Sequence, residues 1–521
     1  MAMLAAARLA ASPLTPEHAR ALDRRRRICV QLDAADHRHV KLAPAEWLDY
    51  VFGFASEAGT QIDSIWLDIG MGEVAVYPST FLEPCMDEQL VRWRTAGFEW
   101  ASALIGGCRK RGLEVFWNHR FSEVDISPSG GLEMERRSPW KAKHPDWVLK
   151  TWWWQGLWNA ASAGLRAHKV EVLREIAETL DLDGFQIDFA RHVPCLPVGR
   201  QWELRGEVTE FLRMTRRMLL DVARKRGKPY LLAAKVPETL AGCRADGFDV
   251  ATWAREELVD ILTLGSRTMY VDVEEFRRVV GKRIKLTPCL DDHHATDGYR
   301  YPPIEFYRGV FTNWLAQGAD SVTTFNWAVS RREFAAKVGG QVAPDAQAEA
   351  YHEAGSLATM AGKSKIFAVE RRGGYPWAEG YFNRNDGAPL PVKLANDGRA
   401  FRTAIRVFER NPGRVTLRLV MFQTRRTDRV EVTWNGAALG AGEASDWKDP
   451  QIFSPKPQPN SGGKGEYPVD PAQKLLRIDY TIPAGAVRYG ANEVGVRLAG
   501  REVYRPGEDV QVEKIEVHTE P

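Results

Sequence analysis

The first part of the chain, about 330 residues, alternates between short apolar runs and segments of helical periodicity. This alternation constrains the fold more than any other feature of the sequence. The runs are rich in β-branched and aromatic residues, as buried strands are, and the segments between them repeat apolar residues at helical spacing. Eight such runs occupy residues 28–33, 64–69, 113–118, 184–189, 230–236, 259–265, 283–289 and 320–326. Strands that alternate with helices pair in parallel, so the pattern predicts a parallel sheet with helices packed against it.

Two of the helical segments have clear ends. An apolar stripe over 208–222 stops at Gly227 and Pro229, directly before the run at 230–236, and the segment 306–317 stops at Gly318 before the last run. Eight strand–helix units in about 330 residues fit a closed (β/α)₈ barrel. An open doubly wound sheet fits less well, because the glycine-rich first turn of that fold is missing here.

A last segment of helical periodicity, at 344–361, completes the predicted barrel. After Lys363 the spacing of the apolar residues changes. Helical stripes give way to short alternating runs at 404–408, 415–422, 430–434, 476–482 and 494–498. Asn435-Gly436 follows one of these runs and is a strong signal for a tight β-hairpin. We therefore predict two domains, a barrel over 1–363 and a β-sandwich over 364–521.

Composition narrows the classes of function. Lys and Arg exceed Asp and Glu by 71 − 68 = 3, so no strongly basic surface for nucleic acid is expected. No apolar stretch of about 18 residues is present, and the alanine-rich start is interrupted by Arg8, so we expect neither membrane insertion nor export. The six cysteines form no Cys-x-x-Cys pair, which favours free thiols. These patterns favour a cytoplasmic protein. An exported form stays open if a leader was lost or mis-assigned, and so does a homo-oligomer.

Every predicted strand of the barrel ends in polar residues. The run at 184–189 places Gln186 and Asp188 on one side of the strand, with Arg191 and His192 just beyond. Active sites of (β/α)₈ barrels lie at the carboxyl ends of the strands, although an aspartate there can equally cap a loop. The polar residues at these ends are Asp33, Asp68, Asn118, His119, Asp188, Arg191, His192, Lys235, Glu238, Arg267, Asp291, Asp292, His293, His294 and Asn326, with Trp327 beside the last. So many ionisable groups on one face predict a substrate pocket, since each buried charge costs free energy.

Asp188 and Glu238 are the pair best suited to acid and base roles, because they follow adjacent strands. Glycoside hydrolysis needs two carboxyl groups, one ionised as nucleophile or base and one protonated as acid. Arg191 would keep Asp188 ionised, and a drier setting would suit Glu238 as the acid. The alternative for Glu238 is a helix start, because Pro237-Glu238-Thr239 also has that pattern.

The segment 166–259 resembles uncharacterised bacterial glycosyl-hydrolase-like barrels that often carry a trailing β-sandwich. The matching stretches are 183–189, 215–217, 234–237 and 247–253. This resemblance implies a TIM-barrel glycosidase and implies no particular substrate.

A looser resemblance is to the α-amylase clan. In that clan the third strand ends in Asn-His, as Asn118-His119 does here, and the fourth ends in the aspartate nucleophile, at the position of Asp188. Gln186 departs from the clan, which keeps an arginine beside the nucleophile, and the departure puts an amylase-type mechanism in doubt. The chitinase pattern fits less well, because Ala190 stands where that family has its catalytic glutamate.

The 18 tryptophans support a carbohydrate substrate, because the apolar face of a sugar packs on an indole ring. Trp152, Trp153 and Trp154 are consecutive, so at least one of them should face solvent or the cleft, and Trp154 is included in the predicted binding set. The run Asp291-Asp292-His293-His294 is a minority candidate for a metal site, but four consecutive residues rarely bind one ion. We expect no metal and no cofactor.

The sequence therefore predicts a glycoside hydrolase of polysaccharide or oligosaccharide degradation, with Asp188 as nucleophile or base and Glu238 as acid. Two alternatives stay open. One is a carbohydrate-binding barrel that has lost catalysis, for which Gln186 is the suspicious residue. The other is a metal-dependent hydrolase or isomerase on the same fold, because a fold does not fix a function.

Overall fold

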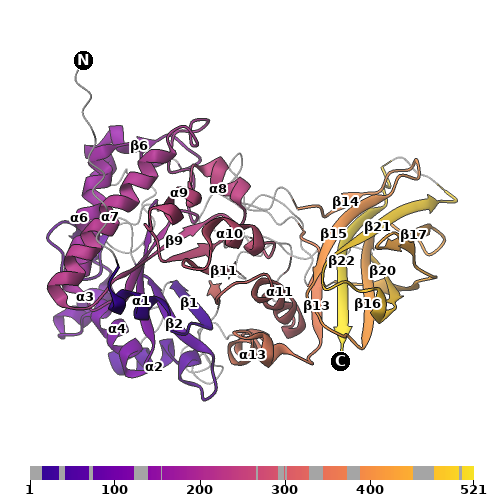
Figure 1. Ribbon diagram of the computed structural model, residues 1–521, viewed down its shortest axis with the longest axis horizontal. Helices are drawn as coiled ribbons and strands as arrows, with labels where there is room; N and C mark the ends of the chain where they lie inside the picture. The colour runs from indigo at the N-terminus through magenta and orange to yellow at the C-terminus, as the bar shows by residue number, and fades with distance from the viewer. Residues whose placement is uncertain are drawn as a thin grey trace.

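A computed structural model gives the arrangement of the chain (Figure 1). It describes residues 14–33, 42–69, 74–122, 139–153, 155–265, 268–291, 299, 302–327, 344–371, 388–449, 475–503 and 507–521. The indigo-to-magenta part of Figure 1 is an α/β barrel, and the orange and yellow part is an all-β domain beside it. The protein is thus a TIM barrel followed by a β-sandwich, as the sequence predicts.

Eight parallel strands close into a barrel in which each strand pairs with its neighbours in chain order, β1-β2-β5-β8-β9-β10-β11-β12 and back to β1. The strands are β1 (Ile28–Asp33), β2 (Ile62–Asp68), β5 (Glu114–Arg120), β8 (Gly184–Asp188), β9 (Leu231–Val236), β10 (Ile261–Leu264), β11 (Lys285–Asp291) and β12 (Val322–Phe325). All eight predicted strands are confirmed, and their ends move by two residues at most. The carboxyl ends of the strands therefore meet at one mouth.

Helices surround the barrel and bury the apolar stripes that predict them. They are α1 (Pro16–Leu22), α2 (Pro44–Val51), α3 (Glu88–Thr95), α4 (Trp100–Lys110), α5 (Pro139–Lys143), α6 (Ala163–Thr179), α7 (Arg205–Arg226), α8 (Leu240–Asp246), α9 (Val250–Arg255), α10 (Val273–Val280), α11 (Ile304–Ala316), α13 (Asp345–Glu353) and α14 (Leu357–Met360). The predicted closing helix at 344–361 is wrong in one respect, because it is split into α13 and α14. Ser356 has an extended backbone and caps α14 with its side chain, which accepts from the N–H of Ala358.

The amino-terminal end of the barrel is closed by aromatic packing. Trp66 of β2 stacks on Phe116 of β5 with ring centroids 4.7 Å apart and an interplanar angle of 12°. Leu22 of α1 packs against the same cluster from below. Gly184 makes room for this stack, because a Cβ atom there would lie 2.4 Å from the Phe116 ring and 2.7 Å from the carbonyl oxygen of Leu231. The barrel is thus a packed core at its lower end and not a pore.

The β-sandwich consists of two antiparallel sheets around their own apolar core. One sheet has the order β13-β22-β16-β20-β19, with β14 on the side of β22, and the other has the order β15-β21-β17-β18. Their strands are β13 (Lys365–Ala368), β14 (Val392–Lys393), β15 (Phe401–Val407), β16 (Arg414–Phe422), β17 (Arg429–Trp434), β18 (Ala437–Ala438), β19 (Glu443–Trp447), β20 (Leu475–Ile482), β21 (Gly490–Gly500) and β22 (Gln511–Glu520). The predicted hairpin is confirmed, because Asn435 and Gly436 have φ angles of 51° and 86° between β17 and β18.

The two domains are joined along helix α11 and strand β13, which lie side by side in Figure 1. Gly309 of α11 allows this contact, because a Cβ atom there would lie 1.9 Å from the carbonyl oxygen of Ile366. Arg406 of β15 reaches back to the barrel and forms an ion pair of 3.1 Å with Asp272. The sandwich is therefore seated on the barrel by backbone-close packing and by polar contacts.

Small elements complete the described chain. Two-stranded sheets are formed by β3 (Val74–Ala75) with β4 (Glu83–Pro84) and by β6 (Val148–Leu149) with β7 (Leu157–Trp158). In the described parts of the chain, no helix has the length and hydropathy that crossing a membrane requires. All six cysteines are free and buried, which confirms the expectation from their spacing.

Replacing Gly184 by alanine tests the floor of the barrel. The added methyl group would push against Phe116 and the backbone of β9, and we expect a loss of about 1–3 kcal/mol in the free energy of unfolding. Gly106 on the exposed face of α4 is the matched control, because nothing lies within 4 Å of its Cβ position, and Gly106→Ala should stabilise by about 0.5–1 kcal/mol. Urea unfolding monitored by tryptophan fluorescence measures the free energy of unfolding of both variants. Equal stability of the two variants would contradict the packing described here.

Candidate active site

Above the aromatic floor, the inward side chains of the barrel are polar. Because side chains alternate along a strand, residues two apart share the interior face. Gln31 of β1, Asn118 of β5, Gln186 of β8 and Thr263 of β10 form one buried layer. Gln186 links its members: its Nε2 atom donates to Asn118 Oδ1 at 2.6 Å and its Oε1 atom accepts from Thr263 Oγ1 at 2.5 Å. Gln186, the departure from the amylase clan, therefore bridges three strands of the barrel.

Asp188 lies one layer higher, at the carboxyl end of β8. It is 1% exposed, and its Oδ1 atom accepts from the backbone N–H groups of Ala190 at 3.1 Å and Arg191 at 2.9 Å. Its Oδ2 atom lies 3.8 Å from Nζ of Lys235 and 3.5 Å from Nε2 of Gln31. Two fixed N–H donors and a cation are the partners that a buried carboxylate anion needs.

Lys235 of β9 is fully buried and belongs to the same group. Its Nζ atom donates to Gln31 Oε1 at 2.9 Å and lies 4.3 Å from the ring centre of Phe325. The guanidinium group of Arg191 lies 5.6 Å from the same ring. Phe325 of β12 thus contacts two cations, each held by the favourable interaction of a positive charge with an aromatic face.

A second ion pair stands beside the first. Asp68 at the end of β2 accepts from Nη2 of Arg120 at 2.7 Å and from Nε2 of Gln31 at 2.8 Å. The amide of Gln31 therefore touches Asp68, Asp188 and Lys235, and it joins the two ion pairs into one network. Asp33 of β1 pairs in register with Asp68, which places its backbone at the same mouth.

Glu238 follows β9 and is 3% exposed. Its side chain packs against the end of β10, where a Cβ atom on Gly265 would lie 2.4 Å from Glu238 Cγ. Helix α8 begins at Leu240 with Thr239 as its cap, so Glu238 precedes the helix and is not part of its first turn. The contacts of Asp188 come from β1, β9 and the backbone after β8, while those of Glu238 lie toward β10 and α8.

A third carboxyl group, that of Asp246 at the end of α8, interacts with Glu238. Burial raises the pKa of Asp246 to about 8, and the charge of Glu238 contributes to the rise. Within the described part of the chain, its Oδ2 atom has no hydrogen-bond partner. Asp246 therefore carries a proton at neutral pH beside Glu238.

Two further pairs occupy the mouth. Asn326 has a φ angle of 58° and donates through Nδ2 to both carboxylate oxygens of Asp291, at 3.2 and 3.3 Å. His192 lies beyond Asp188, with Nδ1 3.2 Å from the carbonyl oxygen of Ser122 and its ring 5.9 Å from that of Trp152. Trp152 is partly exposed, so an indole stands at the edge of the site.

Two predicted binding residues lie away from this group. His119 is next to Asn118 on β5 and faces the opposite side, where burial and the charges of Lys169 and His168 lower its pKa well below the usual value. Trp327 packs between Tyr307 and Tyr351 of the helical layer, with ring distances of 4.7 and 5.5 Å. The structure does not bring either side chain together with Asp188.

Five predicted binding residues lie outside the described residues, namely Trp154, Arg267, Asp292, His293 and His294, and so does the side chain of Asp33. The metal alternative for the run 291–294 rests mostly on that part of the chain. Among the residues that the structure describes, no group of three or more His, Cys, Asp or Glu side chains could hold a metal ion.

Four residues of this group are absent from the set predicted from the sequence, namely Gln31, Arg120, Thr263 and Phe325. A signal for the first two was present, because Gln31 lies two residues before Asp33 and Arg120 two residues after Asn118, on the same strand faces. Thr263 and Phe325 carry no such signal, because a threonine or phenylalanine inside a strand is ordinary core.

No family model and no curated protein sequence matches the chain. Solved structures similar to it include glycoside hydrolases. The α-L-fucosidase isoenzyme 2 of Paenibacillus thiaminolyticus is 14% identical, with 63% of this chain and 49% of that chain covered and a TM-score of 0.40. The glycoside hydrolase domain of PgaB (BpsB) from Bordetella bronchiseptica is 12% identical, with 64% and 99% covered and a TM-score of 0.37. The chitinase ChiW of a Paenibacillus species is 9% identical, with 90% and 52% covered and a TM-score of 0.37. TM-scores this low do not indicate a shared activity. The assignment of the barrel fold follows from the strand order of the protein itself.

The proton on Asp246 predicts a pH dependence of stability. Between about pH 4 and pH 8 the unfolded chain has released this proton while the folded chain still holds it, so stability falls as pH rises, by up to about 1.4 kcal/mol per pH unit. Asp246→Asn cannot lose a proton, so its stability should fall less between pH 5 and pH 8.

Urea midpoints at these two pH values measure the effect. Asp221→Asn on the exposed face of α7 is the control and should keep the wild-type pH dependence. The same fall in Asp246→Asn as in the wild type would contradict a protonated Asp246.

Proposed function

We propose that the protein is a glycoside hydrolase that cleaves O-glycosidic bonds of an oligosaccharide or polysaccharide, with Asp188 as nucleophile or base and Glu238 as acid. The observation that carries this proposal is the setting of Asp188. It is a buried carboxylate at the carboxyl end of the fourth barrel strand, fixed by two backbone N–H donors and by Lys235. A preorganised anion at the mouth of a closed barrel is what attack on, or stabilisation of, a developing positive charge at a sugar carbon requires.

The division of roles follows from the two environments. Asp188 has Lys235 and three hydrogen-bond donors as neighbours, and this fixed polar setting suits a nucleophile or base. Glu238 instead has a buried, protonated Asp246 beside it. A dry site of this kind is where enzymes keep a carboxyl group protonated, and we assign the acid role in it to Glu238.

Trp152 fits a carbohydrate as the substrate class. Trp152 is a partly exposed indole beside His192, and a sugar face can pack on such a ring. The amide, carboxylate and ammonium groups of the network can hydrogen-bond hydroxyl groups as both donors and acceptors. His119 and Trp327 are not part of this proposal, because their side chains face the helical layer.

Asp188→Asn should lower turnover by at least about 10³-fold, because the amide cannot act as nucleophile or base. The screen uses aryl glycosides and a panel of soluble polysaccharides, with reducing-sugar release as the readout. Asp181→Asn is the matched control, since this exposed carboxylate just before β8 should be dispensable. Full activity in Asp188→Asn would end the assignment. Saccharide binding without product release by the wild type would favour the carbohydrate-binding alternative.

The loss of rate in Glu238→Gln should depend on the leaving group of the substrate. Substrates with a poor leaving group need a proton from the acid and should lose about 10²–10⁴-fold in rate, while 2,4-dinitrophenyl glycosides should be affected little. This dependence is measured by comparing kcat/KM of the variant and the wild type across a series of leaving groups. Glu203→Gln, on an exposed surface, is the control and should show no such trend. An equal loss for all leaving groups would show that Glu238 is not the acid.

A further inference from the structure

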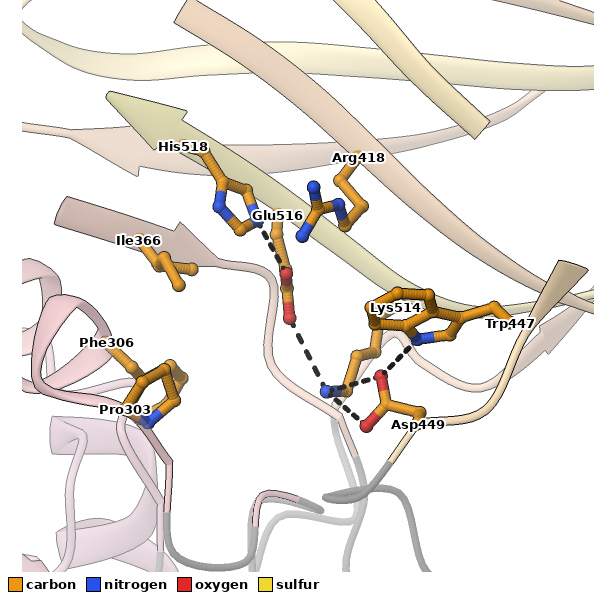
Figure 2. Close-up of a pocket in the computed structure, with 9 residues that line it drawn as sticks. All are labelled: Pro303, Phe306, Ile366, Arg418, Trp447, Asp449, Lys514, Glu516 and His518. Carbon is orange, nitrogen blue, oxygen red and sulfur yellow. Dashed lines mark hydrogen bonds and ion pairs between the residues drawn. The ribbon is translucent and has the colours of Figure 1, made fainter. Parts of the chain in front are cut away.

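A cavity of about 170 Å³ lies where the sandwich meets the barrel. One side consists of Pro303 and Phe306 at the start of α11, and the other is the outer face of the sheet that contains β16, β19 and β22 (Figure 2). Because α11 follows β11, its amino-terminal end lies on the side of the barrel mouth. This cavity is separate from the Asp188 network and takes no part in the proposed hydrolysis.

The polar side chains of the cavity hold one another in place. Lys514 lies 3.1 Å from Asp449 and 3.5 Å from Glu516, and His518 lies 2.8 Å from Glu516 (Figure 2). Burial alone would raise the pKa of Glu516, but Lys514 and the hydrogen bond with His518 outweigh it and lower this pKa to about 2. Lys514 and Glu516 are buried side chains of β22. Donors and acceptors in the cavity are thus fixed before any ligand arrives, which lowers the entropy cost of binding.

The charges in the cavity are balanced. Lys514 is paired with two carboxylates, and Arg418 forms hydrogen bonds of 2.9 and 3.0 Å with Asp479. A net anion would meet the carboxylates Asp449 and Glu516 as well as the cations. A purely apolar ligand would leave these charged groups desolvated without new partners. A neutral ligand with many hydroxyl groups fits, because each hydroxyl can donate to a carboxylate and accept from an N–H group.

Aromatic and apolar surface completes the site. Trp447 of β19 is partly exposed, and its Nε1 atom donates to Asp449 at 3.2 Å, which fixes the ring. Phe306 lines the cavity from α11, and Ile366 lines it from β13 of the sheet, in register with His518 (Figure 2). The guanidinium groups of Arg477 and Arg418, 4.8 and 5.8 Å from the ring centre of Trp447, also hold the indole in place. A fixed indole with convergent polar groups is suited to one face of a pyranose ring.

We propose that this junction cavity binds a neutral saccharide unit, with Trp447 as the packing surface and Asp449, Glu516 and His518 as hydrogen-bonding groups. The sandwich would then be a sugar-binding domain, and its site would lie beside the mouth of the barrel. The inference does not rest on the proposed hydrolysis, because a saccharide can bind here whether or not the barrel cleaves it.

The test uses the full-length wild-type chain, because monosaccharide probes contain no glycosidic bond that the barrel could cleave. D-glucose, D-galactose, D-mannose and N-acetyl-D-glucosamine are titrated by saturation-transfer NMR, with D-glucuronate and inorganic phosphate as anionic probes. At least one neutral sugar should bind with millimolar affinity. Trp447→Ala should weaken this binding by at least tenfold, and Tyr489→Ala, which removes an exposed aromatic elsewhere on the sandwich, should leave it unchanged.

His518→Ala is the second variant and should weaken the same sugar, in case Trp447→Ala lowers the melting temperature of the sandwich. Three outcomes would overturn the proposal. No neutral sugar binds, only the anionic probes bind, or binding persists in both Trp447→Ala and His518→Ala, which would place the sugar elsewhere on the chain.

Discussion

The stack of Trp66 on Phe116 closes one end of the barrel and leaves only the other end for a polar site. These two rings fill the lower interior, and Leu22 of α1 covers them from below. Inward side chains above the stack cannot reach solvent through the floor, so all of them converge on the carboxyl-terminal mouth. Gly184 permits this arrangement, because any side chain at that position would collide with Phe116. The polar chemistry of the protein therefore depends on an apolar contact at the other end of the barrel.

Most buried groups of the polar layers have a partner of the right type, while Oδ1 of Asp68 and Nδ2 of Asn118 have no hydrogen-bond partner among the described residues. Gln31 is central, since its amide donates to Asp68 and Asp188 and accepts from Lys235. Removing a single member would leave a buried charge or amide without its partner, which costs more than the interaction itself contributes. Such a network is rigid, and a rigid arrangement of charges is an advantage for catalysis because it needs little reorganisation during the reaction.

The two domains are connected by a contact that also forms a site. Gly309 lets β13 approach the backbone of α11, and this close approach brings the outer face of the sandwich sheet against the start of the helix. The cavity lined by Trp447 and Lys514 lies at this junction. Barrel and sandwich each have a separate core, so the cavity belongs to neither domain alone.

The architecture can be derived from local sequence patterns alone. The eight strands, the helices between them and the Asn435-Gly436 hairpin follow from local periodicity and turn chemistry, which act over a few residues. The sequence also places Asp188 at a strand end, because strand alternation sets the direction of a side chain relative to its neighbours. The same rule, applied from Asn118, would have turned His119 outward. Gln31 could have been added by counting two residues back from Asp33.

Which of these residues come into contact depends on the folding of distant segments onto one another. The contact of Gln31 with Lys235 joins residues more than 200 positions apart, and the pairing of Glu238 with Asp246 depends on how α8 folds back after β9. The junction cavity likewise depends on the docking of two separate cores. Such contacts depend on barrel closure and on domain packing, and no local pattern encodes them, because the energy that fixes them comes from surfaces distant in the chain.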